Sequence, residues 1–401
     1  MPKPKTQHRR IGLVLNTVPH YSETFFRSKI EGLRAAGFEV LLFVDAQEGN
    51  SGEGIGKVIV GRSFSSRGLR FVGSLLAATC EMLFRHPKQS VRLYRLDKQD
   101  GVPLLQRLKR LLLQQHFFRY RLDWLHFGFG MLATGRENIA KALGARMGVS
   151  FRGYDLYLSP LKHPDCYQYL FKKDVRYHVL AQEMKTTLQQ EYAVPEAAIQ
   201  VIPPAIDVSF FSRKTPKQRR TGVPIQITTI ARLHWKKGLE YTLEALAELA
   251  QKGVDFQYTV IGDGEELERL RFATHQLGLT DRVVFTGKLS QAEIKTRLEH
   301  TDVYLQYSIQ EGFCNAVLEA QAMELFCVVS NAEGLTENVL DGITGRVVPK
   351  RRPALLAEAI QKGIALPEAE QQVLKTAARE RVVREFHLEQ QRTAFFRFYE
   401  S

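Results

Sequence analysis

Residues 303–319 read VYLQYSIQEGFCNAVLE, and this stretch decides the fold of the second half of the chain. The apolar run VYLQYS is typical of a buried strand, whereas NAVLEAQAM, which follows EGFC, has the spacing of an amphipathic helix. A strand that passes through a short loop into a helix is the repeating unit of a parallel sheet covered by helices. The stretch therefore predicts an α/β domain.

The same alternation of strand and helix patterns continues on both sides of this stretch. The chain has 401 residues, enough for two to three domains of ordinary size. A polar, basic, proline-bearing segment at 209–224 is typical of a linker. We therefore predict two doubly wound α/β domains, 1–208 and 225–385, which face each other and hold ligands at the carboxyl ends of their strands. The expected strands are 11–16, 38–44, 122–127, 147–151 and 200–206, then 225–230, 256–261, 283–286, 303–307 and 327–330.

The composition is that of an ordinary globular protein, with 44% hydrophobic and 25% charged residues. The four cysteines stand singly and form neither a metal knuckle nor a disulfide framework, which is typical of a reducing compartment. No run approaches the ~18 apolar residues of a membrane span, and the first residues lead into a strand without a signal-peptide pattern. We expect a cytoplasmic protein.

The net charge of +13 is concentrated in the first half, where residues up to Phe211 include 30 Lys and Arg but 18 Asp and Glu. Such a surplus favours phosphates, anionic lipid or nucleic acid as partners. Leucines at helical spacing in 102–120 predict an amphipathic helix, whose basic residues are Arg107, Lys109, Arg110 and Arg119. Two interpretations stay open: the helix packs its leucines on its own domain, or it faces the inner surface of the cell membrane or an acceptor.

Two carboxylates, Glu311 and Glu319, bracket the start of the helix in the opening stretch. Both can face one ligand that lies across the helix N-terminus, and a carboxylate that accepts from two neighbouring hydroxyls suits a ribose or a hexose. The amides of Gly312, Phe313, Cys314 and Asn315, with the helix dipole, offer positive character to a phosphate. The alternative is structural: Glu311 as an ordinary first-turn acid and Glu319 as a solvated helix residue.

A second motif, IARLHWKKG at residues 230–238, follows the first strand of the second domain and contains Arg232 and Lys237. A guanidinium fork and a lysine ammonium at the carboxyl end of a strand can hold a diphosphate and neutralise it as it leaves. As an isolated basic loop the motif is merely solvated. Its position on the same edge of the sheet as Glu311 favours the functional interpretation.

These residues together resemble the retaining glycosyltransferases of the GT-B fold, a large family of bacterial polysaccharide and lipopolysaccharide enzymes that includes colanic-acid-type transferases. Arg232 and Lys237 match the family's Arg-x-x-x-x-Lys-Gly, and Glu311 and Glu319 match its Glu-x7-Glu. The run 334–349, with Glu-Asn-Val and Asp-Gly-x-x-Gly, matches the end of the family's donor domain.

The first domain resembles the acceptor side of the same family in three loops. Its residues there are Glu23, Thr24, His126, Arg152, Tyr154 and Asp155. Many relatives have a glycine pair after the first strand and a His-Gly-x-Asp loop. Here Arg152 stands where that histidine would be, so His126 is the expected histidine near the transferred sugar.

The resemblance implies a metal-independent hexosyltransferase that moves a sugar, with retention, from a nucleotide sugar to a saccharide or lipid-linked saccharide. Glu311 would hold sugar hydroxyls, Glu319 the ribose, and Arg232 with Lys237 the diphosphate. A helix within 386–401 would cross back to the first domain. Neither a cofactor nor a metal is expected, and no Asp-x-Asp pair is present.

Two other classes of function stay open. One is a nucleotide-sugar epimerase or phosphorylase on the same fold. The other is a nucleic-acid-binding protein, which the basic first half motivates. The sequence has no helix-turn-helix signature and no aromatic-rich RNA-binding strand motif, so we do not expect nucleic acid as a partner.

Overall fold

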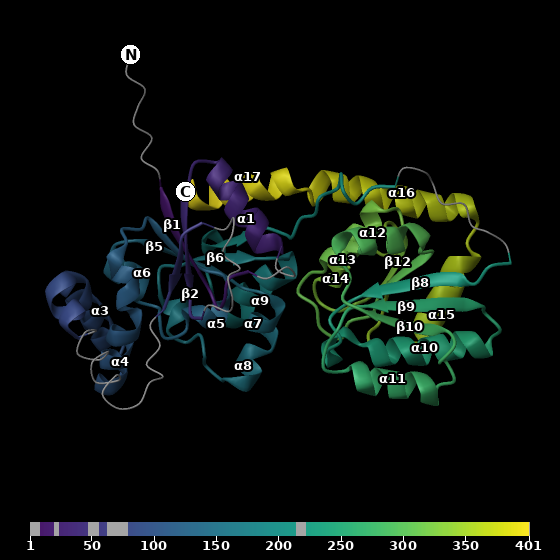
Figure 1. Ribbon diagram of the computed structural model, residues 1–401, viewed down its shortest axis with the longest axis horizontal. Coiled ribbons are helices and arrows are strands. Elements are labelled where there is room, and N and C mark those ends of the chain that lie inside the picture. The colour runs from purple at the N-terminus through teal and green to yellow at the C-terminus, as the bar shows by residue number, and fades with distance from the viewer. Residues whose placement is uncertain (1–8, 20–23, 47–55, 62–78, 214–221, 401) are drawn as a thin grey trace, which may run out of the picture. The chain divides into compact units, whose positions relative to one another are not determined.

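The computed structural model describes residues 9–19, 24–46, 56–61, 79–213 and 222–400 (Figure 1). The chain divides into two compact units. The N-terminal unit comprises Met1–Val179, Met184–Ile202 and Arg392–Ser401, and the C-terminal unit comprises Leu180–Glu183 and Pro203–Gln391. The boundary after Ile202 precedes the expected linker, whose residues 214–221 lie outside the described part.

A seven-stranded sheet in the order β3-β2-β1-β4-β5-β6-β7 forms the centre of the N-terminal unit, and every pairing is parallel. Its strands are β1 (Arg10–Leu15), β2 (Glu39–Val44), β3 (Val58–Val60), β4 (Trp124–Phe127), β5 (Arg146–Ser150), β6 (Arg176–Val179) and β7 (Ile199–Val201). The order reverses between β1 and β4. This is the doubly wound arrangement that the alternating pattern predicts.

Helices connect these strands: α1 (Thr24–Ala35), α3 (Pro87–Gln99), α4 (Leu104–Gln114), α5 (Gly130–Ala133), α6 (Ile139–Leu143), α7 (Gly153–Tyr157), α8 (Ser159–Lys162) and α9 (Gln182–Tyr192). Shorter turns of helix span Glu81–Arg85, Gln115–Arg119, Leu170–Lys172 and Glu196–Ala198. Phe26 and Ile30 of α1 pack with Leu13 of β1, and Phe395 and Phe398 of α17 (Leu388–Glu400) join the same core cluster.

The C-terminal unit repeats the plan with a six-stranded parallel sheet in the order β10-β9-β8-β11-β12-β13. Its strands are β8 (Ile225–Ile230), β9 (Phe256–Ile261), β10 (Val283–Gly287), β11 (Val303–Gln306), β12 (Phe326–Ser330) and β13 (Arg346–Val348). The prediction of an α/β fold with two doubly wound sheets is confirmed. The sequence patterns missed the short strands β3, β6 and β13.

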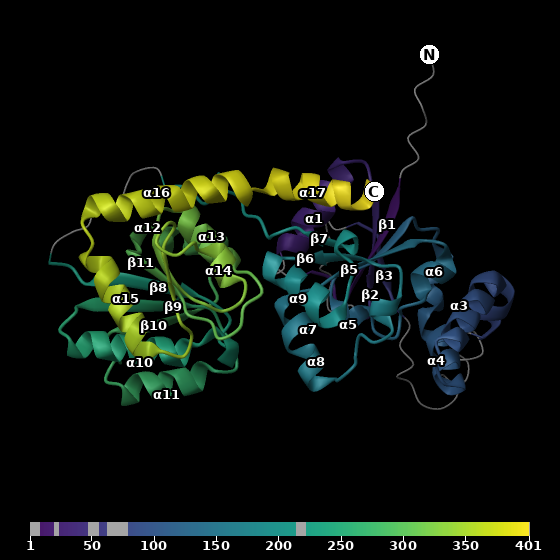
Figure 2. The ribbon, with the colours of Figure 1, turned by 180° about the vertical axis from the view of Figure 1, so that it is seen from behind.

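Two layers of helices enclose this second sheet (Figures 1 and 2). Leu243, Leu270 and Leu356, from three helices of one layer, share a core cluster with the apolar strand residues. That layer contains α10 (Leu239–Gln251), α11 (Leu267–Gln276) and α15 (Pro353–Ala365), and the other contains α12 (Gln291–His300), α13 (Asn315–Ala322), α14 (Leu335–Asn338) and α16 (Glu368–Glu385). Both faces are covered, which explains why the strands are apolar almost throughout.

A chain of hydrogen bonds between polar side chains crosses the core of the N-terminal unit. His178 Nε2 lies 2.9 Å from the carbonyl oxygen of Ile202, which can only accept, so Nε2 carries the proton. In a neutral ring, His178 Nδ1 then accepts from the Ser150 hydroxyl at 2.8 Å. His126 Nε2 lies 2.8 Å from Ser150 Oγ and 3.3 Å from Lys29 Nζ, and His126 Nδ1 lies 2.8 Å from the Tyr399 hydroxyl.

The environment keeps both rings neutral. Burial lowers the pKa of His126 and of His178 well below the usual histidine value, and the electrostatic effect of the nearby Lys29 lowers both further. Because Tyr399 belongs to the last helix, this chain of bonds fixes the end of α17 to strands β4, β5 and β6 of its own unit.

Tyr399→Phe should therefore lower the free energy of unfolding of the N-terminal unit by about 1–3 kcal/mol, because it leaves a buried histidine nitrogen without its hydrogen-bond partner. Urea unfolding at pH 7.5 measures the change. Tyr94→Phe is the matched control, since the Tyr94 hydroxyl has no hydrogen bond to a described residue. An equal loss of stability in both variants would contradict the role of the Tyr399 hydroxyl.

Candidate active site

The candidate site lies where the strand order of the C-terminal sheet reverses. Strands β8 and β11 are neighbours there, paired through Ile227 with Val303 and Thr228 with Tyr304. Their parallel direction brings the loops after both strands, 231–238 and 307–314, to one edge of the sheet. The carboxyl edge at such a reversal is where doubly wound sheets bind ligands.

The loop after β8 is a short turn of 3-10 helix, Trp235–Lys237, closed by Gly238. Gly238 has a φ of 62°, and a Cβ atom there would lie 2.2 Å from the carbonyl oxygen of Tyr307, so only glycine fits. The Lys236 carbonyl accepts from the amides of Ile309 and Gln310 at 2.7 and 3.2 Å. The two loops are thus joined through their backbones.

Lys237 and Glu311 form an ion pair between these loops. Both side chains are largely buried, with 13% and 12% of their surfaces exposed. Burial alone would lower the pKa of Lys237, but the Glu311 carboxylate outweighs that effect and the pKa is raised. The Ser308 hydroxyl also donates to Glu311 Oε2 at 3.3 Å. The pair is therefore charged and held in place.

Arg232 lies beside this pair and is exposed. Its guanidinium has no ion pair or hydrogen bond with any residue in the described ranges, although its charge acts on Lys237. Of the cations and carboxylates expected here, the structure thus brings Arg232, Lys237 and Glu311 to one edge. An unpaired guanidinium next to a fixed ion pair can accept an anionic ligand.

At the start of helix α13, the backbone of Cys314 is already hydrogen-bonded to a side chain, which the sequence did not indicate. The amide of Cys314 donates to Asn338 Oδ1 at 2.9 Å, and Asn338 Nδ2 donates to the Cys314 carbonyl at 3.1 Å. A Cβ at Gly334 would lie 2.0 Å from the Gly312 carbonyl oxygen. The expectation that the Cys314 amide faces a phosphate is therefore wrong, because Asn338 uses it. Phe313 is buried against Phe386, with ring centroids 5.5 Å apart.

Glu319 is a half-buried carboxyl on α13 that has no hydrogen bond to a described residue. Burial raises its pKa to about 7. A carboxyl without a partner in the described part of the chain keeps both oxygens available to a ligand. Asn315, at the first position of the same helix, is partly exposed.

The sequence patterns missed Glu333, which follows β12 on the same edge of the sheet. Its carboxylate accepts from the Glu311 amide at 3.1 Å and pairs with Lys350 at 2.9 Å. A third acidic residue just after a strand was the available signal. Glu333 therefore supports the backbone of the loop that carries Glu311.

The expected acceptor residues belong to the N-terminal unit. Glu23 lies outside the described residues, and Thr24 begins α1. Arg152 places its guanidinium 3.7 Å from the ring centroid of Phe25, and Tyr154 is exposed. Asp155 is buried and caps α7, with Oδ2 accepting from the Arg152 amide at 3.1 Å. Burial raises the pKa of Asp155 to about 6. In the structure its carboxylate stabilises the start of α7.

His126 is not placed to touch a sugar. Its side chain is fully buried, and both ring nitrogens take part in the hydrogen-bond chain described above. The predicted catalytic role is therefore wrong for this histidine. The pattern Leu-His-Phe-Gly at 125–128 forms the end of β4 and the residue after it, and all four residues of this strand are buried in the core of the sheet.

The part of the chain that the structure describes has no group of three or more His, Cys, Asp or Glu side chains that could hold a metal ion. No described helix is long and apolar enough to cross a membrane.

Known proteins resemble the chain in sequence. The family described as Glycosyl transferases group 1 matches residues 211–381. The chain is 29% identical over 271 residues to the amylovoran biosynthesis glycosyltransferase AmsK of Erwinia amylovora, an alignment that covers 66% of each chain. It is 29% identical over 280 residues to WcaL of Escherichia coli, which is named for colanic acid biosynthesis, with 67% and 68% covered. The chain thus matches about two thirds of the length of these relatives.

Solved structures match the fold over nearly the whole chain. A glycosyltransferase from Rickettsia africae has a TM-score of 0.70 at 19% identity and covers 98% of both chains. HepE of Anabaena, solved with UDP, has a TM-score of 0.72 at 14% identity and covers 97% and 98%. The family match over residues 211–381, the relatives and the fold agree, and the chain is a glycosyltransferase with the two-domain GT-B fold.

Proposed function

We propose that the protein transfers a hexosyl group, with retention, from a nucleoside-diphosphate sugar to a saccharide or lipid-linked saccharide in the synthesis of a cell-surface polysaccharide. The observation that carries the proposal is the convergence of Arg232, Lys237 and Glu311 on the carboxyl edge between β8 and β11. The names of AmsK and WcaL support the polysaccharide, and the UDP bound to HepE supports a nucleotide donor.

In this proposal Arg232 and Lys237 hold the diphosphate and neutralise the negative charge that grows on it as the glycosidic bond breaks. The Lys237 ammonium retains N–H donors that its bond to Glu311 does not use. Glu311 likewise retains its second carboxylate oxygen, which can accept from sugar hydroxyls. Because the ion pair is already formed, neither charge has to be reoriented during the reaction. Glu319 accepts from the ribose hydroxyls.

Glu311→Gln should reduce turnover at least about tenfold, a loss of 1.4 kcal/mol or more in transition-state stabilisation, because an amide holds the sugar hydroxyls more weakly. Initial rates with a nucleotide-sugar panel measure the effect. Glu268→Gln, which alters an exposed carboxylate on α11 away from the site, is the control and should retain wild-type activity. Wild-type turnover in Glu311→Gln with an unchanged melting temperature would contradict the assignment.

Donor affinity should rise between pH 6 and pH 8, since the pKa of Glu319 is about 7 and only its ionised form accepts fully from two hydroxyls. The Michaelis constant for the donor should therefore fall by several-fold across this range. In Glu319→Gln the same profile should be flat. An equal slope in wild type and variant would assign the titration to another group and refute the ribose role.

Activity should persist in EDTA, because Arg232 and Lys237 supply the charge neutralisation. Arg232→Ala should raise the donor Michaelis constant by about tenfold or more, the size expected for a lost charge-assisted bond, and added Mg²⁺ should not restore it. The metal-independent mechanism fails if EDTA abolishes wild-type turnover and Mg²⁺ or Mn²⁺ restores it.

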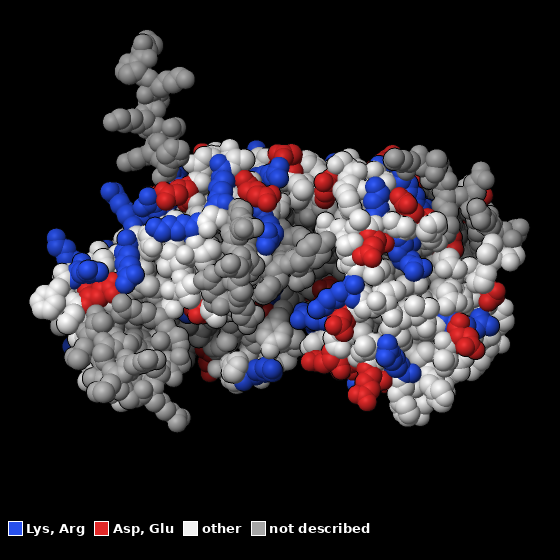
Figure 3. Space-filling view, in the orientation of Figure 1, with Lys and Arg blue, Asp and Glu red and all other residues white. Residues whose placement is uncertain are grey.

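The acceptor side of the proposal rests on α4. Leu104, Leu105 and Leu108 are 51%, 80% and 42% exposed, whereas Leu111 of the same helix is buried. On the face drawn in Figure 3, blue Lys and Arg side chains predominate over the N-terminal unit, whereas blue and red mix over the other unit. Exposed leucines on a basic unit suit peripheral contact with an anionic membrane that carries a lipid-linked acceptor.

Most of the basic residues beside these leucines have structural partners. Arg110 pairs with Asp97 and Glu137 at 3.5 and 3.4 Å, and Arg119 pairs with Glu81 at 2.6 Å. Arg107 packs over the ring of Tyr94. Lys109 is exposed. The exposed leucines, rather than these cations, are therefore the positions to change in a membrane test.

Wild-type protein should float with vesicles that contain phosphatidylglycerol, and Leu104→Gln/Leu105→Gln/Leu108→Gln should not, because insertion of the apolar face is lost. The control is Leu161→Gln/Phe272→Gln/Val373→Gln, which removes equally exposed apolar side chains elsewhere. Flotation that is equal in both triple variants, or absent in wild type at low salt, would contradict membrane contact through α4.

A further inference from the structure

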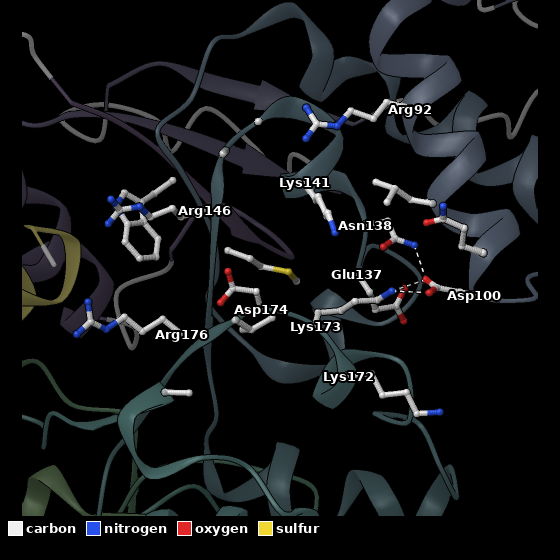
Figure 4. A pocket seen from close by; sticks show the side chains of 18 of the residues that line it. Arg92, Asp100, Glu137, Asn138, Lys141, Arg146, Lys172, Lys173, Asp174 and Arg176 are labelled. Atoms are coloured by element: carbon white, nitrogen blue, oxygen red, sulfur yellow. Dashed lines mark hydrogen bonds and ion pairs between the residues drawn. The ribbon is translucent and has the colours of Figure 1, made fainter.

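The N-terminal unit contains a large hollow on the edge of its sheet opposite to the carboxyl ends. Its volume is about 870 Å³, and Trp124, Arg146 and Arg176, which begin β4, β5 and β6, line it (Figure 4). Pockets for small molecules commonly have this size. The hollow lies within one unit, and the proposed transferase chemistry does not use it.

Cations reach this hollow from separate parts of the fold. Arg92 comes from α3, Lys141 from α6, Arg146 from β5, Lys172 from the turn Leu170–Lys172 and Arg176 from β6. They come from three separate stretches of the sequence, at 92, 141–146 and 172–176, so no single charged run explains them. The fold itself gathers positive charge around the cavity.

The acidic side chains in the lining are mostly neutralised by other partners. Asp100 pairs with Lys173 at 2.5 Å and accepts from Asn138 at 2.6 Å. Glu137 pairs with Arg110, which lies outside the lining, at 3.4 Å. With Asp174, the lining contains three Asp and Glu against six Lys and Arg. The hollow therefore has an excess of positive charge.

Two of the cations are held close together by aromatic packing. The Arg146 guanidinium stacks over Trp124 at 5.4 Å, and the Arg176 guanidinium stacks over Phe398 at 5.2 Å and donates to its carbonyl at 3.0 Å. Burial lowers the pKa of Arg176, and the charge of Arg146 lowers it further. Two positive charges held side by side repel each other, and an anion bound near both would reduce that repulsion.

We propose that this hollow is a second binding site, for a molecule that bears several phosphate or carboxylate groups, such as a charged segment of a saccharide or a phospholipid headgroup. This site is independent of the donor site, because its residues lie at the amino ends of the strands of the N-terminal sheet. Planar guanidinium groups and ammonium groups on several sides suit oxyanions.

Tryptophan fluorescence can report this site directly. The chain has two tryptophans, and Trp235→Phe leaves Trp124, in the wall of the hollow, as the only one. In that background, inorganic pyrophosphate should change the Trp124 emission in a saturable way. Arg92→Gln/Lys141→Gln should raise the midpoint at least tenfold. Lys98→Gln/Lys162→Gln, which removes the same charge from exposed positions outside the lining, should shift it less than twofold.

Calorimetry with pyrophosphate gives a second readout in a protein that also contains Arg232→Ala. It should detect saturable binding that Arg92→Gln/Lys141→Gln removes and the control pair retains. Equal weakening by both pairs, or no saturable binding by either method, would overturn the site. Flotation with phosphatidylglycerol vesicles distinguishes a lipid headgroup from a soluble anion as the ligand. If Arg92→Gln/Lys141→Gln no longer floats, the ligand is a lipid headgroup. If it floats normally but binds pyrophosphate more weakly, the ligand is a soluble anion.

Discussion

The pairing of β8 with β11 is the contact on which the candidate site depends. Chain connectivity does not require these strands to be neighbours, because β9 and β10 lie between them in the sequence. Side chains reinforce the ladder: Thr228 bonds to Thr301 at 2.8 Å, and Thr229 donates to the Leu305 carbonyl at 2.8 Å. This pairing brings a basic loop and an acidic loop to one edge. Neither loop could form a phosphate and sugar site alone.

The ion pair between Lys237 and Glu311 converts that proximity into a fixed site. Breaking a buried pair by removing one partner typically costs about 3–5 kcal/mol, so a ligand gains more by binding to the intact pair than by separating it. The pair leaves N–H donors of Lys237 and the second carboxylate oxygen of Glu311 available to a ligand. A phosphate next to a hydroxylated ring satisfies both, which is the chemistry of a sugar diphosphate.

Much of the fold was predictable because strands buried on both faces are strongly apolar. The bounds expected for β8 and β9 are those observed. Strand β6 escaped prediction because it contains His178, whose burial depends on Ser150 and on the Ile202 carbonyl. A strand with a polar residue of this kind cannot be recognised from an apolar pattern, because the residue's hydrogen-bond partners come from other parts of the chain.

The candidate site was predictable in its loops but not in its details. Strand order places Arg232, Lys237 and Glu311 on one edge, whereas the bond of Asn338 to the Cys314 amide depends on how a later loop folds back. The error over His126 has the same origin. Its partner Tyr399 is 273 residues away in sequence, so no local pattern could identify this histidine as part of the core.

Hydrogen–deuterium exchange with and without nucleoside diphosphates tests the central claim most directly, because it locates binding without assuming the sugar or the acceptor. UDP, GDP and ADP are each added to the full chain. For the base that binds, we expect slower exchange in 231–239 and 308–319, which contain the two loops at the carboxyl edge between β8 and β11. Protection of the N-terminal unit alone, or around β9 and β10 without these loops, would contradict the assignment of the donor site.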